Sequence, residues 1–534
     1  MRRVSFRLLA LVLAMALLLS GCALDFAGYF ARLANVFRPV SFENMIYTRP
    51  DPVLLDDALT ACLESAGGSN LDKLVGNINT LNSICNSFHT NYYLAYIHYS
   101  IDMTDSYWEG EYEHCSQVSL RVQAAVDELM YALAASPLRA ELEGEEYFGP
   151  GYFDDYDGES MWTEEFIALK DQETNLVNQY YELVSLTGPM DTRSETFYST
   201  LGAQMAEVYV QLVQVRQQIA AEAGYDSYTA YAYDVTYSRD YTPEQAGVLL
   251  TNIRTELVGL YQQLAESNIW NDLDYSLEDQ TFSYVQTMAQ AMGGVIQDAF
   301  TTMANGGLYH ISYGENKTGS SFTVYLPEYE VPFVLVSPTL TDYDKLTFAH
   351  EFGHFCNDFA TAGSATSIDV GEVFSQGLEY LSLCYADGGE TLTGMKLADS
   401  LCVYIEQAFV ADFETRVYGM SADSLTVENV QTLYGQVAAE YGLGELVDSR
   451  NYVNVPHLFN SPLYVISYVV SNDAALQMYQ MELEQEGTGL SCYINNLTTQ
   501  QTGFVAFLQE AGLESPFAEG HISTVKKLFD TVLN

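Results

Sequence analysis

The chain has 534 residues, 48% of them apolar, and its 71 acidic and 21 basic residues give a formal net charge of −50. This apolar content excludes a disordered chain, and the length predicts two or more lobes. The strong negative charge disfavours anionic partners, so we expect no binding to nucleic acid or to anionic lipid surfaces.

The first 22 residues have the pattern of a bacterial export signal. Arginines stand near the start, and the apolar run Leu8–Leu19 is too short to span a membrane comfortably. The end of the run, Leu19-Ser20-Gly21-Cys22, resembles the lipobox of bacterial lipoproteins. We therefore expect a lipid on Cys22, a tether over residues 23–45, and an extracytoplasmic location in which this lipid is the only membrane anchor. The alternative is a secreted protein with an incidental cysteine.

A helical lobe is predicted over residues 46–190. Apolar residues recur at helical spacing from Val53 to about Leu142, with breaks at Gly67-Gly68 and at Trp108-Glu109-Gly110. Helical spacing returns from Glu164 to Leu186. The pattern is typical of a bundle of helices.

Residues 191–534 are assigned to a second domain, which is also mainly helical. In its middle, Ser321–Leu326 and Val331–Ser337 are short and rich in β-branched and aromatic residues, which predicts a small hairpin. An extended peptide can add to a sheet edge as a further strand, and we expect docking along Val331–Ser337. Helical spacing before the hairpin covers Ser194–Ala223, Pro243–Ser267 and Leu277–Ala304.

Directly after the hairpin, the helical pattern of Asp344–Asp358 contains His350-Glu351-Phe352-Gly353-His354, the HExxH motif of zinc peptidases. His350 and His354 are one turn apart, so both can bind one tetrahedral Zn²⁺. Glu351 stands beside the first ligand and can take the proton of the attacking water. With only 8 histidines in the chain, a chance match is improbable.

The third protein ligand is expected among the acidic residues that follow. Glu372 and Glu379 are two helical turns apart and share a face, so one can bind the metal while the other supports it. Asp369 is a further candidate. Glu372 is favoured, because a glutamate on a helix that faces the HExxH helix is the usual third ligand of such sites.

Several segments together resemble the thimet oligopeptidase and oligoendopeptidase F family of zinc metallopeptidases, most closely its bacterial oligoendopeptidases. They span almost the whole chain after the signal, in the order of the family. The segments are Tyr47–Asp51, Ala221–Tyr228, Asn316–Gly319, Pro332–Leu335, Phe348–His354, Glu372–Glu379 and Pro456–Tyr468.

The resemblance implies a mainly α, two-lobed metallopeptidase with a small β-sheet beside the zinc helix and a deep substrate channel. It implies one Zn²⁺ per chain, with Glu372 as third ligand, since Glu372, Ser375 and Glu379 match the family's Glu, Ser, Glu pattern. It also implies catalytic roles for a distal histidine and two tyrosines. These match His457, Tyr464 and Tyr468, with Tyr468 as a donor to the oxyanion.

The predicted function is zinc-dependent cleavage of internal bonds in short peptides outside the bacterial membrane. One alternative is a peptide-binding lipoprotein without catalysis, which the intact Glu351 disfavours. The other is a zinc aminopeptidase, disfavoured because no Gly-x-Met-Glu-Asn segment is present to anchor a free amino terminus. Seven cysteines remain besides Cys22, and their irregular spacing predicts mainly buried thiols.

Overall fold

A computed structural model describes residues 40–144, 147–158, 160–187, 194–265, 275–363, 367–498 and 503–533. The predicted signal and lipobox, and most of the predicted tether, lie outside the described residues. None of the helices that are described is both long enough and apolar enough to cross a membrane.

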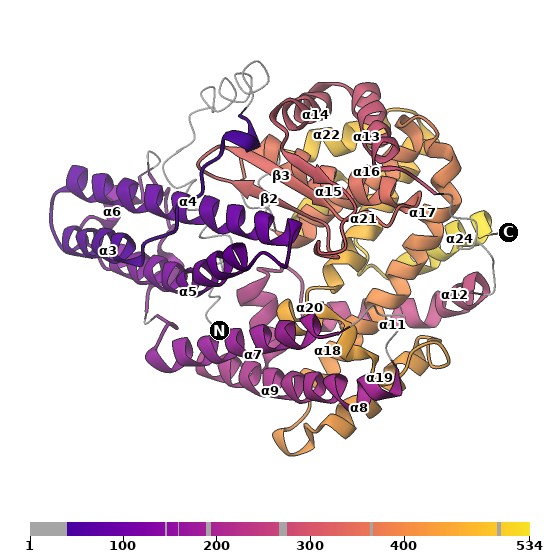
Figure 1. Cartoon of the computed structure of the whole chain (residues 1–534), viewed down its shortest axis with the longest axis horizontal. Helices are drawn as coiled ribbons and strands as arrows, with labels where there is room; N and C mark the ends of the chain where they lie inside the picture. Colours follow the sequence, from indigo (N-terminus) through magenta and orange to yellow (C-terminus); the bar gives the residue numbers. More distant parts are fainter. Residues whose placement is uncertain are drawn as a thin grey trace. The chain divides into compact units, whose positions relative to one another are not determined.

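The chain forms two compact units, each built from three separate segments (Figure 1). Unit 1 contains the residues up to Ser160, Asp272–Thr393 and Ala475–Thr502. Unit 2 contains Met161–Asn271, Gly394–Ala474 and the residues from Gly503 onward. The units follow tertiary contacts, whereas the lobes expected from the sequence are contiguous along the chain.

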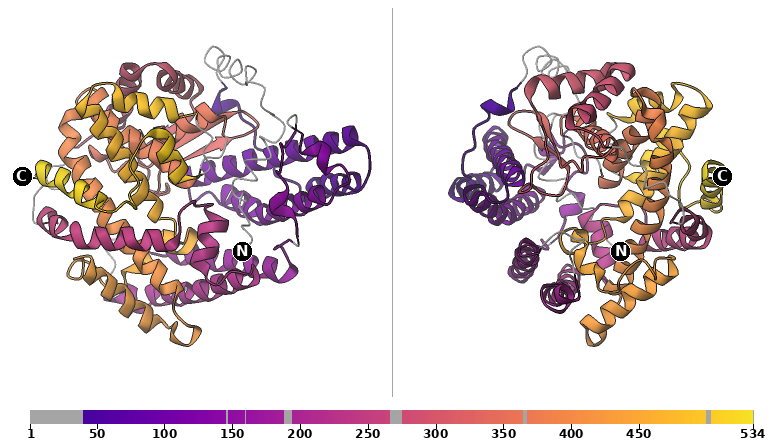
Figure 2. Two further views of the ribbon diagram at one scale, coloured as in Figure 1. Left: turned by 180° about the vertical axis from the view of Figure 1, so that it is seen from behind. Right: turned by 45° about the vertical axis from the view of Figure 1, so that its right-hand side comes forward.

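Unit 1 begins with three long helices that run alongside one another: α3 (Pro52–Ala66), α4 (Leu71–Ile101) and α5 (Ser106–Ala134) (Figure 2). The predicted break at Gly67-Gly68 is confirmed. The break predicted at Trp108–Gly110 is wrong, because Asp105 caps α5 by accepting a hydrogen bond from the Tyr107 amide (2.9 Å). Gly110 therefore lies inside the helix.

Unit 1 also has a small sheet and several other helices. These helices are α6 (Arg139–Leu142), α13 (Glu278–Met292), α14 (Gly294–Gly306), α15 (Tyr343–Thr361), α16 (Ile368–Tyr385), α22 (Thr488–Asn496) and the part of α21 (Ile466–Glu484) from Ala475 onward.

The sheet has the strand order β1-β3-β2. Its strands are β1 (Tyr309–Ile311), β2 (Phe322–Leu326) and β3 (Val331–Val336), and β3 pairs parallel with β1 and antiparallel with β2. The predicted hairpin is confirmed. Strand β1 is not predicted from the sequence, because three residues are too few to show an alternating pattern.

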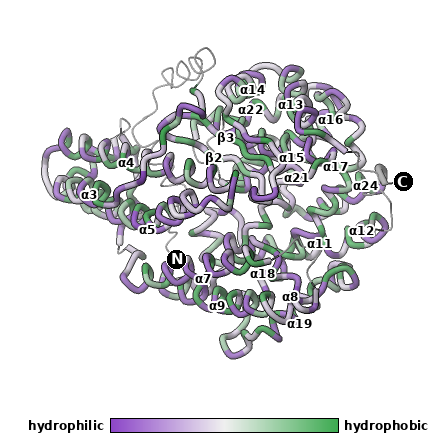
Figure 3. Tube along the Cα trace, in the orientation of Figure 1, coloured by the Kyte–Doolittle hydropathy of each residue, from purple (hydrophilic) through white to green (hydrophobic). Residues whose placement is uncertain are grey.

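The prediction that a peptide docks along Val331–Ser337 is wrong. β3 is the central strand, so both of its edges are already hydrogen-bonded, and all of its residues are buried. Figure 3 shows the hydrophobic character of this region. The outer edge on the hairpin side belongs to β2, whose first three residues are only half-buried.

Helices α15 and α16 pack against each other beside the sheet (Figure 1). Asp344 fixes the start of α15, since its carboxylate accepts hydrogen bonds from the backbone amides of Thr339–Thr341. The helix stops at Ala362, which has a left-handed backbone with φ 55°. Ser367 caps α16 by accepting a hydrogen bond from the Val370 amide.

Unit 2 is helical throughout its described residues. Its helices are α7 (Glu164–Ser185), α8 (Glu195–Ser199), α9 (Leu201–Glu222), α10 (Tyr228–Tyr231), α11 (Pro243–Glu256), α12 (Val258–Ala265), α17 (Thr393–Cys402, from Gly394 onward), α18 (Ala408–Tyr418), α19 (Val427–Glu440), α20 (Pro456–Asn460), the start of α21, α23 (Phe504–Ala511) and α24 (His521–Leu533). The predicted fold class, mainly α with a small sheet beside the HExxH helix, is therefore confirmed.

Candidate metal centre

The two histidines of the HExxH motif lie one turn apart on α15 in unit 1. The centroids of their imidazole rings are 5.0 Å apart. The side chains of His350 and His354 are 20% and 25% exposed, although most of α15 is buried. The helix thus presents two accessible rings on one face, as their spacing predicts.

Glu372 on α16 completes a group of three donors. Its Oε2 lies 3.4 Å from His350 Nε2 and 3.6 Å from His354 Nε2. Two donors that are each about 2.0–2.1 Å from a tetrahedral metal stand about 3.3–3.4 Å apart, so these separations fit one Zn²⁺. Among the residues that the structure describes, this is the one group of three His, Cys, Asp or Glu side chains whose ligand atoms all lie within 4.8 Å.

Gly353 allows α15 and α16 to approach each other closely. A Cβ atom at this position would lie 2.5 Å from the carbonyl oxygen of Phe374 and 2.5 Å from Cα of Ser375. A larger residue would push α16 away from α15. The glycine inside the motif therefore helps Glu372, one turn before Ser375, to reach the histidines.

Two further side chains of α16 hold members of this group in place: Ser375 contacts Glu372, and Glu379 contacts His350. The hydroxyl of Ser375 donates a hydrogen bond to Glu372 Oε2 (2.9 Å). Glu379 Oε1 lies 2.7 Å from His350 Nδ1, the ring nitrogen that does not face Glu372. A carboxylate at Nδ1 fixes the tautomer that leaves Nε2 available for a metal.

The three acidic candidates on α16 thus occupy different places. Glu372 faces both histidines, and Glu379 contacts the opposite side of the His350 ring. Asp369, in the first turn, is 1% exposed and does not belong to the three-donor group.

Glu351 lies beside the first histidine and is 6% exposed. The hydroxyl of Thr323 on β2 donates hydrogen bonds to Glu351 Oε2 (2.9 Å) and to the Glu351 carbonyl (2.8 Å). Burial raises the pKa of Glu351 to about 7. A carboxyl group with such a pKa can both accept and return a proton near neutral pH.

The two histidines differ in protonation. Burial lowers the pKa of His354 to about 4, so its ring is neutral at pH 7. Burial also acts to lower the pKa of His350, but the hydrogen bond to Glu379 together with the charges of the neighbouring glutamates outweighs it and raises this pKa to about 9. A protonated ring nitrogen cannot coordinate, so metal binding must displace a proton from His350.

His457, Tyr464 and Tyr468 lie together in unit 2. The His457 ring centroid is 5.6 Å from that of Tyr464 and 5.9 Å from that of Tyr468, and the two tyrosine centroids are 5.1 Å apart. Each side chain is half-buried. His457 lies on α20, Tyr464 in the turn that joins α20 to α21, and Tyr468 at the start of α21.

Sequence reasoning missed the residues that hold these side chains in place. Thr323 lies in a predicted strand, but a strand pattern does not tell which helix a side chain faces. Likewise, no sequence motif marks the buried side chains that form hydrogen bonds with the backbone between His457 and Tyr468. These residues become visible only once distant segments are brought together.

The described cysteines lie outside the three-donor group. Of the seven described cysteines five are buried, Cys402 is half-buried and Cys384 is exposed. The expectation of mainly buried thiols is confirmed.

The comparisons with known proteins agree with this fold. Residues 42–160 match the family model of the peptidase M3 N-terminal domain. Among curated proteins, no sequence matches the chain significantly.

Solved structures share the fold over nearly the whole chain. One named for oligoendopeptidase F is 19% identical with a TM-score of 0.81, covering 92% of this chain and 98% of its own. The structure of Pz peptidase A with an inhibitor is 19% identical with a TM-score of 0.81, and the match covers 92% of this chain and 99% of the Pz peptidase chain. One named for oligoendopeptidase F from Bacillus anthracis is 21% identical with a TM-score of 0.78, covering 92% and 98%.

The resemblance noted in the sequence is therefore confirmed. Residues 42–160 match the family model of the peptidase M3 N-terminal domain, and the chain has the fold of solved structures named for oligoendopeptidase F.

Proposed function

We propose that the protein is a zinc-dependent oligoendopeptidase, which hydrolyses internal bonds of short peptides. One observation carries this proposal: Glu372 Oε2 lies 3.4 Å and 3.6 Å from the ring nitrogens of His350 and His354, close to the separation of about 3.3–3.4 Å that one tetrahedral metal requires, with Glu351 next to His350. A chain that only bound peptides would not need a buried carboxylate at this place.

In the proposed site, His350, His354 and Glu372 hold one Zn²⁺, and Glu379 orients His350. When bound, the ion supplies Lewis acidity, which makes water more acidic and polarises a carbonyl group. The donor set is typical of a catalytic rather than a structural zinc site, because within the described part of the chain three protein ligands converge rather than four.

Glu351 is proposed to move the proton. It takes a proton from the attacking water and returns it to the amine that leaves. Its raised pKa, about 7, suits both steps at neutral pH. Thr323 keeps the carboxylate in one orientation through the bond to Oε2.

His457, Tyr464 and Tyr468 are proposed to stabilise the tetrahedral oxyanion that forms when water adds to the peptide carbonyl. A tyrosine hydroxyl is a suitable donor for such an oxygen, and Tyr468 is assigned this role. His457 and Tyr464, which contact the Tyr468 ring, would orient the substrate or the intermediate.

The peptide is proposed to dock along β2. The Val334 amide donates to the Leu308 carbonyl, so Val334 faces β1. Its antiparallel partner Thr323 then directs its own backbone groups away from β3, towards the outer edge. An extended substrate can add as a strand there. Thr323 would thus align the peptide with its backbone and hold Glu351 with its side chain.

The substrates are proposed to be unstructured peptides of roughly 6 to 20 residues, a range set by the reach of an extended chain. A deep channel, as the resemblance implies, would admit such peptides and exclude folded domains. The high negative charge further disfavours nucleic acid as a partner.

We also propose that the protein acts outside the cytoplasm, anchored by a lipid on Cys22. The apolar run and the lipobox pattern support this location. Wild type should incorporate a labelled fatty acid and sediment with membranes, whereas Cys22→Ser should incorporate none.

A peptide library tests the enzymatic proposal. Purified protein should cleave internal bonds, blocking of either terminus should be tolerated, and a chelator should stop the reaction, all read by mass spectrometry. Cleavage only beside a free amino terminus would indicate an aminopeptidase. Chelator-independent binding without cleavage would indicate a binding lipoprotein, and rapid degradation of native serum albumin would contradict the channel.

A further inference from the structure

The chain leaves regular helical structure between α20 and α21, in the segment that carries His457, Tyr464 and Tyr468. Leu463 in this turn is 2% exposed and has a left-handed backbone, with φ 64°, which is strained for a branched residue. Backbone carbonyls in such a turn cannot all be paired within a helix. Because the turn is buried, they need other partners.

Arg216 of α9 holds the first part of this segment. It is 0% exposed, and its Nη1 donates to the Leu458 carbonyl (2.9 Å) while its Nη2 donates to the Phe459 carbonyl. Its Nε donates to Glu173 Oε1 of α7 (2.7 Å). The ring of Phe459 also stacks on Tyr180 of α7, with centroids 3.7 Å apart.

Tyr237 and Arg239 hold the second part. The Tyr237 hydroxyl donates to the Pro462 carbonyl (2.7 Å). Arg239 Nη2 donates to the Leu463 carbonyl (3.0 Å) and to the Ser467 hydroxyl (2.9 Å), one residue before Tyr468. The guanidinium of Arg239 lies 4.5 Å from the Tyr237 ring centroid, which limits its own movement.

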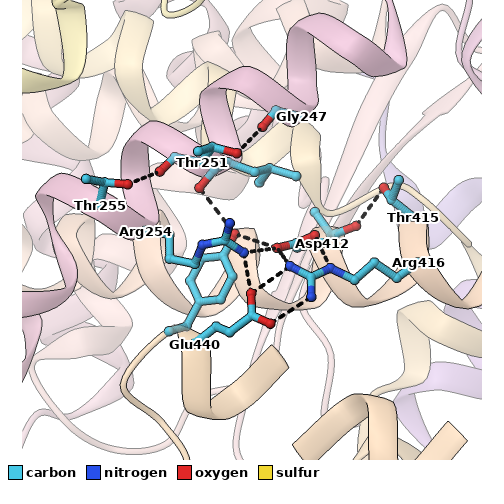
Figure 4. A network of polar contacts seen from close by, with 11 residues as sticks. Gly247, Thr251, Arg254, Thr255, Asp412, Thr415, Arg416 and Glu440 are labelled. Atoms are coloured by element: carbon cyan, nitrogen blue, oxygen red, sulfur yellow. Dashed lines mark hydrogen bonds and ion pairs between the residues drawn. The ribbon is translucent and has the colours of Figure 1, made fainter. Parts of the chain in front are cut away.

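Glu414 of α18 completes these contacts from another direction. It is 0% exposed, and its Oε1 accepts a hydrogen bond from the Leu463 amide (2.7 Å). Helix α18 is itself held in place by a charge network, in which Arg416 contacts Asp412 (2.8 Å) and Glu440 (2.8 Å) (Figure 4). Arg254 of α11 contacts the same two carboxylates.

We infer that Arg216, Tyr237, Arg239 and Glu414, here called the cradle, are positioning residues that set the turnover rate by holding the Tyr464 and Tyr468 side chains in their reactive placement. The inference rests on the proposed role of Tyr468 as an oxyanion donor. None of the four needs to touch the substrate, because they act through the backbone that joins the two tyrosines to His457.

Geometry explains why the cradle matters for rate. A donor stabilises a transition state only within a narrow range of distance, and a misplacement of about 1 Å can lower turnover about 10²-fold. The two tyrosine rings and His457 contact one another, so a shift of the turn would displace them together. If the cradle served only to satisfy buried carbonyls, its loss would change stability and leave turnover unchanged.

A matched pair of variants tests the inference. Tyr237→Phe removes the hydroxyl that grips Pro462, whereas Tyr261→Phe removes a hydroxyl that contacts Glu406 Oε1 (2.9 Å) elsewhere in unit 2. Both tyrosines are 7% exposed, so the two changes are closely comparable. Tyr237→Phe should lower kcat about tenfold with KM within about twofold and zinc content unchanged. Tyr261→Phe should retain wild-type kcat.

A double variant decides whether the effect passes through the tyrosines. If it does, Tyr237→Phe combined with Tyr468→Phe should be slowed by clearly less than the product of the two single effects. Arg239→Lys, which keeps the charge but not the paired contacts, should give the same pattern if it folds. Equal kcat in Tyr237→Phe and wild type, or a double variant slowed by the full product, would overturn the inference while the enzyme remained a zinc peptidase. An unchanged kcat in Tyr468→Phe alone would overturn both the oxyanion role and the inference.

Discussion

The metal centre and the turn before Tyr468 place functional side chains in two different ways. On α15, His350 and His354 are spaced by the period of a regular helix, and a glycine lets α16 pack close enough to add Glu372. In unit 2 the side chains stand around an irregular turn. Residues such as Arg216, more than 240 positions earlier in the chain, hold its backbone.

A regular helix and an irregular buried turn need different kinds of support. A helix satisfies its own backbone groups, so only the side chains of the metal centre need neighbours. An irregular buried turn leaves its carbonyls to side chains, and polar side chains are costly to bury unless they are paired. Substitutions that abolish the function of the metal centre should therefore lie among its own few residues. The function of the turn should also be lost through substitutions of residues that never touch a substrate.

The largest effect should follow from Glu351→Gln, which breaks the metal centre without removing a ligand. Turnover should fall about 10²- to 10⁴-fold, the range for loss of a general base, because an amide cannot accept the proton. Zinc content, measured by atomic spectroscopy, should stay near one per chain. His350→Ala is the matched control and should lose both zinc and activity. An undiminished rate in Glu351→Gln would disprove the assigned role.

The corresponding change in unit 2 is Tyr468→Phe, which removes one hydroxyl and almost no volume. Turnover should fall about 10²- to 10³-fold, the usual effect of losing one oxyanion donor, while zinc content and KM change little. Steady-state kinetics on one quenched-fluorescence peptide would measure this. A raised KM with normal kcat would instead make Tyr468 a binding residue.

The stability that ionised Glu173 contributes, as the partner of Arg216, should fall at acid pH. Burial acts to raise the pKa of Glu173, but Lys170 and Arg216 outweigh it and lower this pKa to about 2. Because the pKa of Glu173 is lower in the folded protein than in the unfolded chain, where it is near 4.5, the ionised carboxylate stabilises the fold at any pH above about 4.5. This contribution is lost as the pH falls from about 4.5 to about 2. Because one pKa unit corresponds to about 1.4 kcal/mol, the contribution is on the order of 3 kcal/mol.

Thermal unfolding followed by circular dichroism at several pH values between 7 and 2 would measure this loss. Glu173→Gln should be less stable than wild type at pH 7 and should depend less on pH in the acid range. A parallel loss of stability in both proteins would show that Glu173 does not contribute in this way.

The smallest effect should distinguish the two glutamates of α16. Glu379 contacts His350 Nδ1, so Glu379→Ala should weaken zinc affinity about 10- to 100-fold, the usual effect of removing a residue that orients a ligand. Glu372→Ala should instead release zinc during dialysis. Competition with a chelating dye would rank the two, and the reverse order would assign the ligand role to Glu379.

The sequence by itself determined the parts of this protein that are local. The four-residue spacing of His350 and His354 specifies one helix face, and the seven-residue spacing of Glu372 and Glu379 specifies another. The hairpin was predictable from its β-branched strands. Family motifs then pointed to His457, Tyr464 and Tyr468, which no periodicity would have singled out.

Only the tertiary structure decided how these parts are held. The pairing of β1 with β3 made β3 central and moved the outer edge to β2, because a three-residue strand forms only where a neighbour offers hydrogen bonds. The approach of α16 to α15 placed Glu372 and Glu379 at opposite nitrogens of His350. The cradle likewise joins α9, α18 and the turn before α21. Such contacts depend on packing between distant segments, which a linear pattern does not encode.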